Sequence, residues 1–199
     1  MTILRPIGAA EYRRVRWKND GGWTTELARD ADAGGDAFRW RVSIAEIERD
    51  GPFSRFPGVE RDLLLLDGAG LELEIDGGPA RRLAWRFERA HFAGEADVHC
   101  RLLGGPTRDF NVMVRRDALR AEVVARPLAG SMVILPEAGA EWFVHVFAGG
   151  ARASGDAGRV DLDGGASLHV DFRDGGRRVV LEGGGELVLA KFVPAAAAR

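Results

Sequence analysis

Cysteine, tyrosine and lysine are nearly missing from this chain of 199 residues. It has one cysteine and one tyrosine, and Lys18 and Lys191 are the only lysines among 28 basic side chains. The single cysteine, Cys100, cannot form an internal disulfide and excludes a cysteine-rich metal site. The scarcity of cysteine indicates a protein of a reducing compartment.

Excess charge and long apolar runs are absent too. The 28 basic and 30 acidic side chains give a net charge of −2, which argues against a nucleic-acid-binding protein of the strongly basic kind. No window approaches the roughly 18 apolar residues that a membrane helix needs, and residues 1–6 are too poor in apolar side chains for a signal peptide. We therefore expect a cytoplasmic protein without nucleic-acid or membrane partners.

Glycine is abundant, with 27 residues, and it clusters in short turn signals. Asp67-Gly68, Asp76-Gly77-Gly78 and Asp163-Gly164-Gly165 are typical of hairpin turns. Between such signals, runs such as residues 71–76 and 168–173 alternate apolar and polar side chains, as half-buried strands do. The pattern predicts an all-β fold with less than about a fifth helix.

The turn chemistry changes near residues 115–117, which divides the chain into two predicted domains. Residues 1–116 and residues 117–199 would each have the size of one small β-barrel. The best helical candidate is short and covers residues 116–124. We therefore expect two barrels made almost entirely of strands.

Residues 17–27 bring two tryptophans, a lysine, an amide and two acids around a Gly-Gly bend. Glycines allow backbone conformations closed to other residues and a close approach to a ligand. The spacing does not fit a phosphate-binding P-loop. Two interpretations remain: a ligand-binding loop, or a tight turn held by its own Asn or Asp side chain.

Residues 38–45 form a predicted strand in which Arg41 and Ser43 share one face. One interpretation places that face in water. The other places it inside a barrel, where a buried arginine needs an acidic partner or an anionic ligand. Sequence alone leaves both open.

Two more segments carry unusual polar residues. Arg61 precedes the apolar strand at residues 63–66, a position typical of a barrel rim. Further on, Asp109, Asn111 and Met113 alternate along a second strand and therefore share a face. Two polar side chains beside a methionine predict a small, partly polar pocket.

Together and in this order, these segments resemble the HutD/Ves family. The matching motifs are residues 17–26, 40–45, 51–61 and 105–113, within a resemblance that spans about residues 14–115. Asp20 stands where the family usually has a third glycine. The resemblance implies a bicupin, two small cupin-type β-barrels in one chain, in a bacterial cytoplasm. It also implies an association with histidine-utilisation genes. The expected protein binds a formylated or acidic amino-acid metabolite and thereby regulates histidine utilisation. No enzymatic activity is established for the family.

Residue types and resemblance together give one set of candidate ligand-binding residues: Trp17, Lys18, Asn19, Glu26, Arg41, Ser43, Arg61, Asp109 and Asn111. The cations would bind carboxylates, the amides a carbonyl, and the tryptophan would form a wall. The alternative is a metal-independent cupin enzyme that acts on an acyl or amide group, with Glu26 or Asp109 as acid or base. The expected partner is a small carboxylate, and a homodimer is open.

The histidines do not form a metal motif. Metal-binding cupins usually bring a His-x-His pair, and no two of the four histidines, at positions 91, 99, 145 and 169, are two residues apart. Glu141 and His145 would be about 13 Å apart along a strand. We expect no metal and no cofactor. A Gly-x-Ser-x-Gly nucleophile elbow is absent, so no catalytic residue is assigned.

Overall fold

The computed structural model describes residues 1–30, 38–172 and 176–195. Within these ranges the chain forms strands and a single 3-10 helix, η1 (Ala9–Glu11). The prediction of an all-β fold with little helix is thereby confirmed. The described part of the chain has no helix with the length and hydropathy to span a bilayer.

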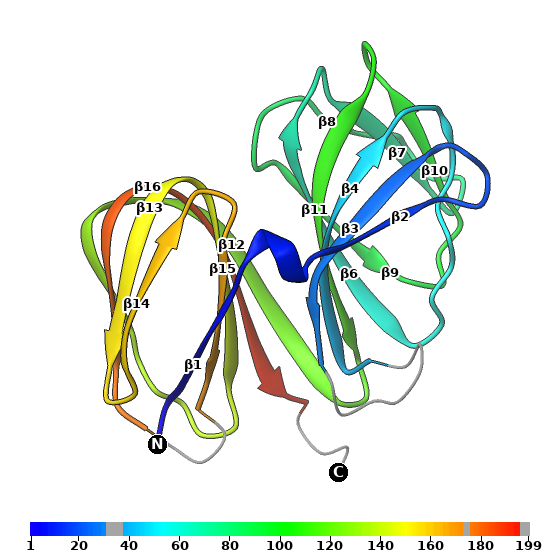
Figure 1. Cartoon of the computed structure of the whole chain (residues 1–199). Coiled ribbons are helices and arrows are strands. Elements are labelled where there is room, and N and C mark those ends of the chain that lie inside the picture. Colours follow the sequence, from blue (N-terminus) through cyan, green and yellow to red (C-terminus); the bar gives the residue numbers. More distant parts are fainter. Residues whose placement is uncertain (31–37, 173–175, 196–199) are drawn as a thin grey trace. The chain divides into compact units, whose positions relative to one another are not determined.

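The chain divides into two compact units, each described by itself below (Figure 1). The N-terminal unit is Tyr12–Ala118, and the C-terminal unit combines Met1–Glu11 with Leu119–Arg199. The strands of the N-terminal unit are β2 (Arg13–Arg16), β3 (Gly22–Arg29), β4 (Trp40–Ile47), β5 (Gly51–Pro52), β6 (Val59–Asp67), β7 (Leu71–Ile75), β8 (Arg81–Leu83), β9 (Arg89–Ala93), β10 (Val98–Leu102) and β11 (Thr107–Arg115). Those of the C-terminal unit are β1 (Ile3–Ile7), β12 (Leu119–Ile134), β13 (Glu141–Gly155), β14 (Gly158–Asp163), β15 (Ser167–Asp171) and β16 (Val179–Pro194).

The N-terminal unit contains two antiparallel sheets. The larger has the order β2-β3-β4-β11-β6-β9 and the smaller β5-β10-β7-β8. Leu63 and Leu65 of β6 pack in one buried cluster with Leu73 of β7 and with Val98 and Cys100 of β10. The two sheets therefore face each other across this core, and the β6 face that carries Leu63 is the inner face of the larger sheet.

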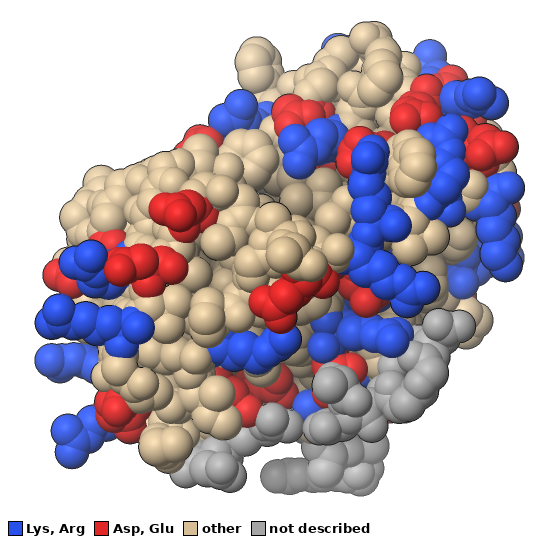
Figure 2. Space-filling view, viewed as in Figure 1, with Lys and Arg blue, Asp and Glu red and all other residues tan. Residues whose placement is uncertain are grey.

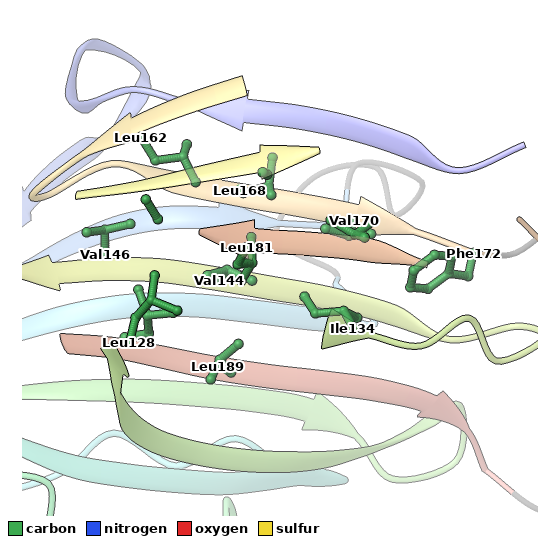
Figure 3. Close-up of a cluster of buried hydrophobic side chains, with 14 residues drawn as sticks. Leu128, Ile134, Val144, Val146, Leu162, Leu168, Val170, Phe172, Leu181 and Leu189 are labelled. Carbon is green, nitrogen blue, oxygen red and sulfur yellow. The ribbon is translucent and has the colours of Figure 1, made fainter. Parts of the chain in front are cut away.

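The C-terminal unit is one sheet, in the order β1-β15-β13-β16-β12 with β14 paired to β13. Its long strands bend where Gly149 and Gly185 adopt φ of 82° and 144°, values that L side chains rarely adopt. A Cβ on Gly185 would also overlap the carbonyl oxygen of Ala148. The bend lets both halves of the strands cover one apolar cluster, in which Figure 3 shows Val144, Leu168 and Phe172 among others.

Two predictions differ from the structure. The first predicted domain began at residue 1, whereas Met1–Glu11 belongs to the C-terminal unit because Ile3–Ile7 pairs with β15. The predicted helix at residues 116–124 is wrong, since β12 begins at Leu119 and pairs with β16 along its whole length. Leu119 and Val123 are buried with exposed residues between them, and pairing with a neighbouring strand outweighs local helix propensity.

Candidate ligand-binding site

Strand register brings the central candidate residues onto one face of the larger sheet. Asn111 of β11 lies opposite Ser43 of β4 and Leu63 of β6, and Ser43 lies opposite Glu26 of β3. Directly opposed residues of an antiparallel sheet share a face, and Leu63 marks this face as the inner one. Ser43, Asn111 and Glu26 therefore form a polar row inside the N-terminal unit.

A second row on the same face is cationic. Met113 of β11 lies between Arg41 of β4 and Arg61 of β6. The predicted shared face of Asp109, Asn111 and Met113 is confirmed, and Arg41 lies on the inner face of the sheet rather than in open water. Two arginines separated by a methionine give the inner face a positive region.

Arg61 is buried inside the unit, with only 7% of its surface exposed, and not at a rim as predicted. Its Nη2 donates to Oδ1 of Asn111 at 3.0 Å, and its Nη1 donates to the carbonyl oxygen of Ser54 at 3.3 Å. Its Nε has no hydrogen-bond partner among the described residues. An unpaired donor in a buried guanidinium is costly.

Three aromatic rings surround the Arg61 guanidinium. Its Cζ lies 5.3 Å from the ring centre of Phe53, 5.6 Å from that of Phe56 and 5.0 Å from that of Phe92. Aromatic faces attract a cation that has lost its water. They do not replace the lost hydration, because burial lowers the pKa of Arg61 to about 10 while the nearby Asp109 charge opposes that shift.

Asp109 is the second buried charge and is fully inaccessible. Its Oδ1 accepts a hydrogen bond from the Asn111 amide, and its Oδ2 has no partner in the described structure. Burial raises the pKa of Asp109 to about 7, against the opposing effects of Arg61 and Asn111. Asn111 thus links the two charges, since its oxygen accepts from Arg61 and its nitrogen donates to Asp109.

A cavity of about 370 Å³ opens beside this cluster. Across it, Arg41 Nε donates to Glu26 Oε2 at 2.6 Å, and Arg29 Nε lies 3.7 Å from Glu26 Oε1. The residues that line it are Arg13, Val15, Trp17, Thr24, Glu26, Arg29, Phe38, Arg41 and Phe56. Among the described residues that line the cavity, three arginines face one glutamate, an excess of two positive charges. The volume suits a small molecule.

Aromatic side chains form the cavity walls. Trp17 donates its indole N–H to the hydroxyl of Thr24 at 2.8 Å, which fixes the orientation of the ring. Phe56 both lines the cavity and stacks on Arg61. Arg61 therefore lies one ring behind the cavity wall.

Lys18 and Asn19 lie in the exposed turn between β2 and β3 and are not among the described residues that line the cavity. The Asn19 Oδ1 accepts a hydrogen bond from the Gly21 N–H at 3.0 Å, the side-chain-to-backbone bond expected of a tight turn. Asp20 follows with φ of 55°. That left-handed conformation explains why a glycine suits the position, and Asp20 is held by two hydrogen bonds from Arg16.

Sequence reasoning missed several residues of the site. Arg13, Arg29 and Phe38 line the cavity, and Phe92 stacks on Arg61. Arg29 reaches the site because the register between β3 and β4 shifts at residues 26–28, which sets it opposite Arg41. A single sequence carries no signal for such a bulge.

Two histidines outside the N-terminal unit are held in hydrogen-bonded pairs. In the C-terminal unit Glu141 bonds His169 at 2.9 Å, and His145 bonds Ser167 at 2.9 Å. In the residues that the structure describes, no three His, Cys, Asp or Glu side chains are grouped as a metal site requires. Burial, together with the Asp109 charge, raises the pKa of Cys100 to about 12, so its thiol is not a nucleophile at neutral pH.

Comparisons with known proteins are consistent with the motifs. A family model described as HutD matches residues 9–189. An uncharacterised 21.2 kDa protein in the hutC 3′ region of Pseudomonas putida is 45% identical over 123 residues, 62% of this chain and 64% of that protein. Protein Ves of Cronobacter sakazakii is 39% identical over 113 residues, 54% of this chain and 58% of its own. The chain thus spans about three fifths of the length of these curated relatives.

Solved structures extend the likeness over the whole chain. A conserved protein of unknown function from Pseudomonas aeruginosa PAO1 superposes with a TM-score of 0.86 at 29% identity, covering 96% of this chain and 99% of that one. HutD from Pseudomonas fluorescens SBW25, in a formate condition, gives a TM-score of 0.82 at 30% identity over 98% and 100%. The Escherichia coli pirin YhhW with nickel(II) reaches 0.70 at 12% identity over 98% and 100%, a likeness of fold alone.

Proposed function

Because the chain belongs to the HutD family, we propose that it binds a small metabolite with two carboxylates, a formylated or otherwise acidic amino acid, in its N-terminal unit. The observation that carries the proposal is the buried Arg61, whose Nε lacks a partner among the described residues beside a cavity walled by Trp17 and Phe56. A buried cation is attracted to an anion in the neighbouring cavity more strongly than an exposed one, because the surrounding protein screens the two charges less than water does.

Charge supports a doubly negative ligand. Arg13, Arg29 and Arg41 outnumber Glu26 at the cavity by two positive charges. A formylated glutamate carries two carboxylates and no ammonium group, so its charge of about −2 balances this excess. Free glutamate carries an ammonium group that the arginines would repel. The proposed site therefore favours an acidic amino acid with a blocked amine.

The individual roles follow from position. Arg41 would bind one carboxylate from the cavity wall while Arg61 attracts it from behind Phe56. Ser43, opposite Glu26 and Asn111 on the inner face, offers a hydroxyl to the formyl or amide group. Trp17 would pack against the aliphatic part of the ligand.

Calorimetric titration with N-formyl-L-glutamate and with L-glutamate tests the proposal. Arg61→Gln and Arg41→Gln are compared with Arg126→Gln, a matched control for an exposed arginine of the C-terminal unit. We expect the blocked compound to bind more tightly than glutamate. Loss of the Arg61 charge should cost about 2–5 kcal/mol of binding free energy, and the control should change nothing.

Equal affinity of Arg61→Gln and wild type for the formylated compound would contradict the assignment. So would ligand-induced shifts of amide resonances confined to the C-terminal unit. A thermal melt of each variant verifies that it is folded before titration.

A second candidate function is acid–base catalysis on the same ligand. It is favoured by Asp109, because burial raises the pKa of this carboxyl to about 7, near the optimum for proton transfer at neutral pH. Release of formate from N-formyl-L-glutamate, followed by proton NMR, tests it. Turnover that disappears in Asp109→Asn would replace the binding role by an enzymatic one.

We also propose the setting that the family implies: a cytoplasmic, metal-free bicupin dimer that regulates histidine utilisation. Support comes from the curated relative in the hutC 3′ region and from the all-β units. Deleting the gene should change growth on histidine as sole nitrogen source. The Arg61→Gln variant should fail to restore it, and unchanged growth after deletion would contradict the regulatory role.

A further inference from the structure

A basic hollow lies on the C-terminal unit, away from every residue that the proposed function uses. It has a volume of about 890 Å³ and is bordered by Pro136, Ser154, Asp156 and the arginines Arg159, Arg177 and Arg178, among others. All three arginines are exposed. In Figure 2 Lys and Arg side chains project from the edge of this unit.

The arginines of the hollow differ from the arginine at a neighbouring strand position because they form no ion pair with a described acidic side chain. Arg152 lies opposite both Asp161 and Glu182 and pairs with Asp161 at 2.6 Å. Two residues further along the hairpin, Arg159 lies opposite Ser154, a neutral residue. None of the acidic side chains in the described ranges lies within ion-pairing distance of Arg159, Arg177 or Arg178.

The backbone that carries these arginines is held in place. The buried Thr2 hydroxyl accepts from the Arg177 N–H at 3.1 Å and donates to the Arg177 carbonyl oxygen at 3.0 Å. Gly176 sits so close that a Cβ there would overlap the Thr2 hydroxyl. On the opposite side, Arg159 follows the tight turn at Gly158, whose φ is 111°. The guanidiniums thus project from two fixed backbone positions.

We propose that this hollow binds a small oxyanion with two or more negative charges, such as a phosphate ester or a polycarboxylate. Among the described residues that border the hollow, three guanidiniums face the single carboxylate of Asp156, an excess of two positive charges. Guanidinium groups bind phosphate and carboxylate oxygens through paired hydrogen bonds, and Ser154 adds a hydroxyl on the floor between Arg159 and Val180. The hollow is thus a second anion site, independent of the N-terminal cavity.

Titration with pyrophosphate and with citrate at low ionic strength, followed by calorimetry and by amide NMR shifts, tests this site. We expect saturable binding of at least one of the two, with shifts at residues 154–159 and 177–180. The stronger of the two probes distinguishes phosphoryl from carboxylate chemistry. Acetate, with a single charge, should bind at least about tenfold more weakly.

The double variant Arg159→Ser with Arg178→Ser should lose at least about tenfold in affinity, and the ion-paired Arg152→Ser should stay within about twofold of wild type. Arg61→Gln should bind the probe as wild type does, which separates this site from the proposed function. The proposal fails if neither probe binds, if the double variant binds unchanged, or if the shifts fall only in the N-terminal unit. Arg152, Arg159 and Arg178 are exposed, so their substitutions should retain the fold, and a thermal melt verifies that Arg61→Gln is folded before titration.

Discussion

The two units solve the same packing problem with different interiors. The cluster at the centre of the C-terminal unit contains only aliphatic residues, alanine and phenylalanine (Figure 3). The inner face of the N-terminal unit carries Arg61, Asp109 and Asn111 next to a comparable apolar cluster. The C-terminal unit buries charge outside this cluster, at Glu141, where the carboxylate bonds His169.

This difference separates the residues that stabilise a unit by packing from the residues that we propose serve ligand binding. Burying Arg61 and Asp109 removes both from water, and one polar atom of each has no partner in the described residues. Such burial seldom gains stability over well-packed apolar residues. In the C-terminal unit the buried Glu141 and His145 bond His169 and Ser167, so the buried charges that lack a described partner atom are a feature of the N-terminal interior.

The strongest test of the difference between the two interiors removes the Arg61 charge first and then the Asp109 charge as well. Arg61→Met should cost about 3–5 kcal/mol of unfolding free energy, because it leaves the Asp109 carboxylate buried without its cation. Adding Asp109→Val removes the buried carboxylate as well and should recover most of the loss. Urea denaturation measures both effects. A double variant less stable than Arg61→Met would show that the charges support the fold.

A smaller effect is expected from a cavity in the apolar interior. Leu168 is fully buried in the C-terminal cluster, so Leu168→Ala should cost about 2–5 kcal/mol of unfolding free energy. Affinity for the formylated ligand at a temperature where the variant is folded should stay unchanged. Loss of affinity without loss of fold would link the two interiors and weaken the division between them.

The pH dependence of stability should differ between the interiors as well. Burial raises the folded-state pKa of Asp109 to about 7 from the usual 3.8, so the folded chain holds a proton that the unfolded chain releases. Its contribution is therefore full below about pH 4 and is lost as the pH rises through about 7. Unfolding free energies of wild type minus those of Asp109→Asn should decline over this window.

The exposed Asp117 provides the control of opposite sign. A hydrogen bond from Arg115 lowers the pKa of Asp117, so its stabilising contribution is present above its ordinary pKa and is lost on acidification. Asp117→Asn should leave the neutral-pH decline intact. A decline that persists in Asp109→Asn would assign it to another group.

The smallest expected effect distinguishes a role of Asn19 in the turn from a role in ligand binding at the cavity. Asn19→Ala removes the hydrogen bond to Gly21 and should cost about 1 kcal/mol of unfolding free energy. Affinity for the formylated ligand should stay within about twofold, since Asn19 does not line the cavity. A large loss of affinity would return Asn19 to the ligand contacts expected from the sequence.

Strand periodicity predicted much of the site. A repeat of two residues assigns each side chain to a face, which placed Asp109 with Asn111 and Arg41 with Ser43. It assigns no depth, so Arg61 was expected at a rim although loop 51–58 covers it with Phe53 and Phe56.

Register and long-range pairing were beyond the sequence. The bulge in β3 that sets Arg29 opposite Arg41 depends on both strands at once. The pairing of β1 with β15 joins segments that are more than 150 residues apart, and no local pattern at residues 3–7 specifies that partner. The local sequence predicted which face of a strand each side chain occupies, whereas tertiary contacts determine which strands are neighbours.

The pairing of β1 with β15 has a consequence for biosynthesis. Tyr12–Ala118 is one uninterrupted stretch that leaves the ribosome early and contains both sheets of its unit. Ile3–Ile7 emerges before it, yet its partner Ser167–Asp171 is translated near the end. Ile3–Ile7 can therefore complete this pairing only after Ser167–Asp171 has been translated. During that interval a chaperone that shields residues 3–7 would have its largest influence on yield.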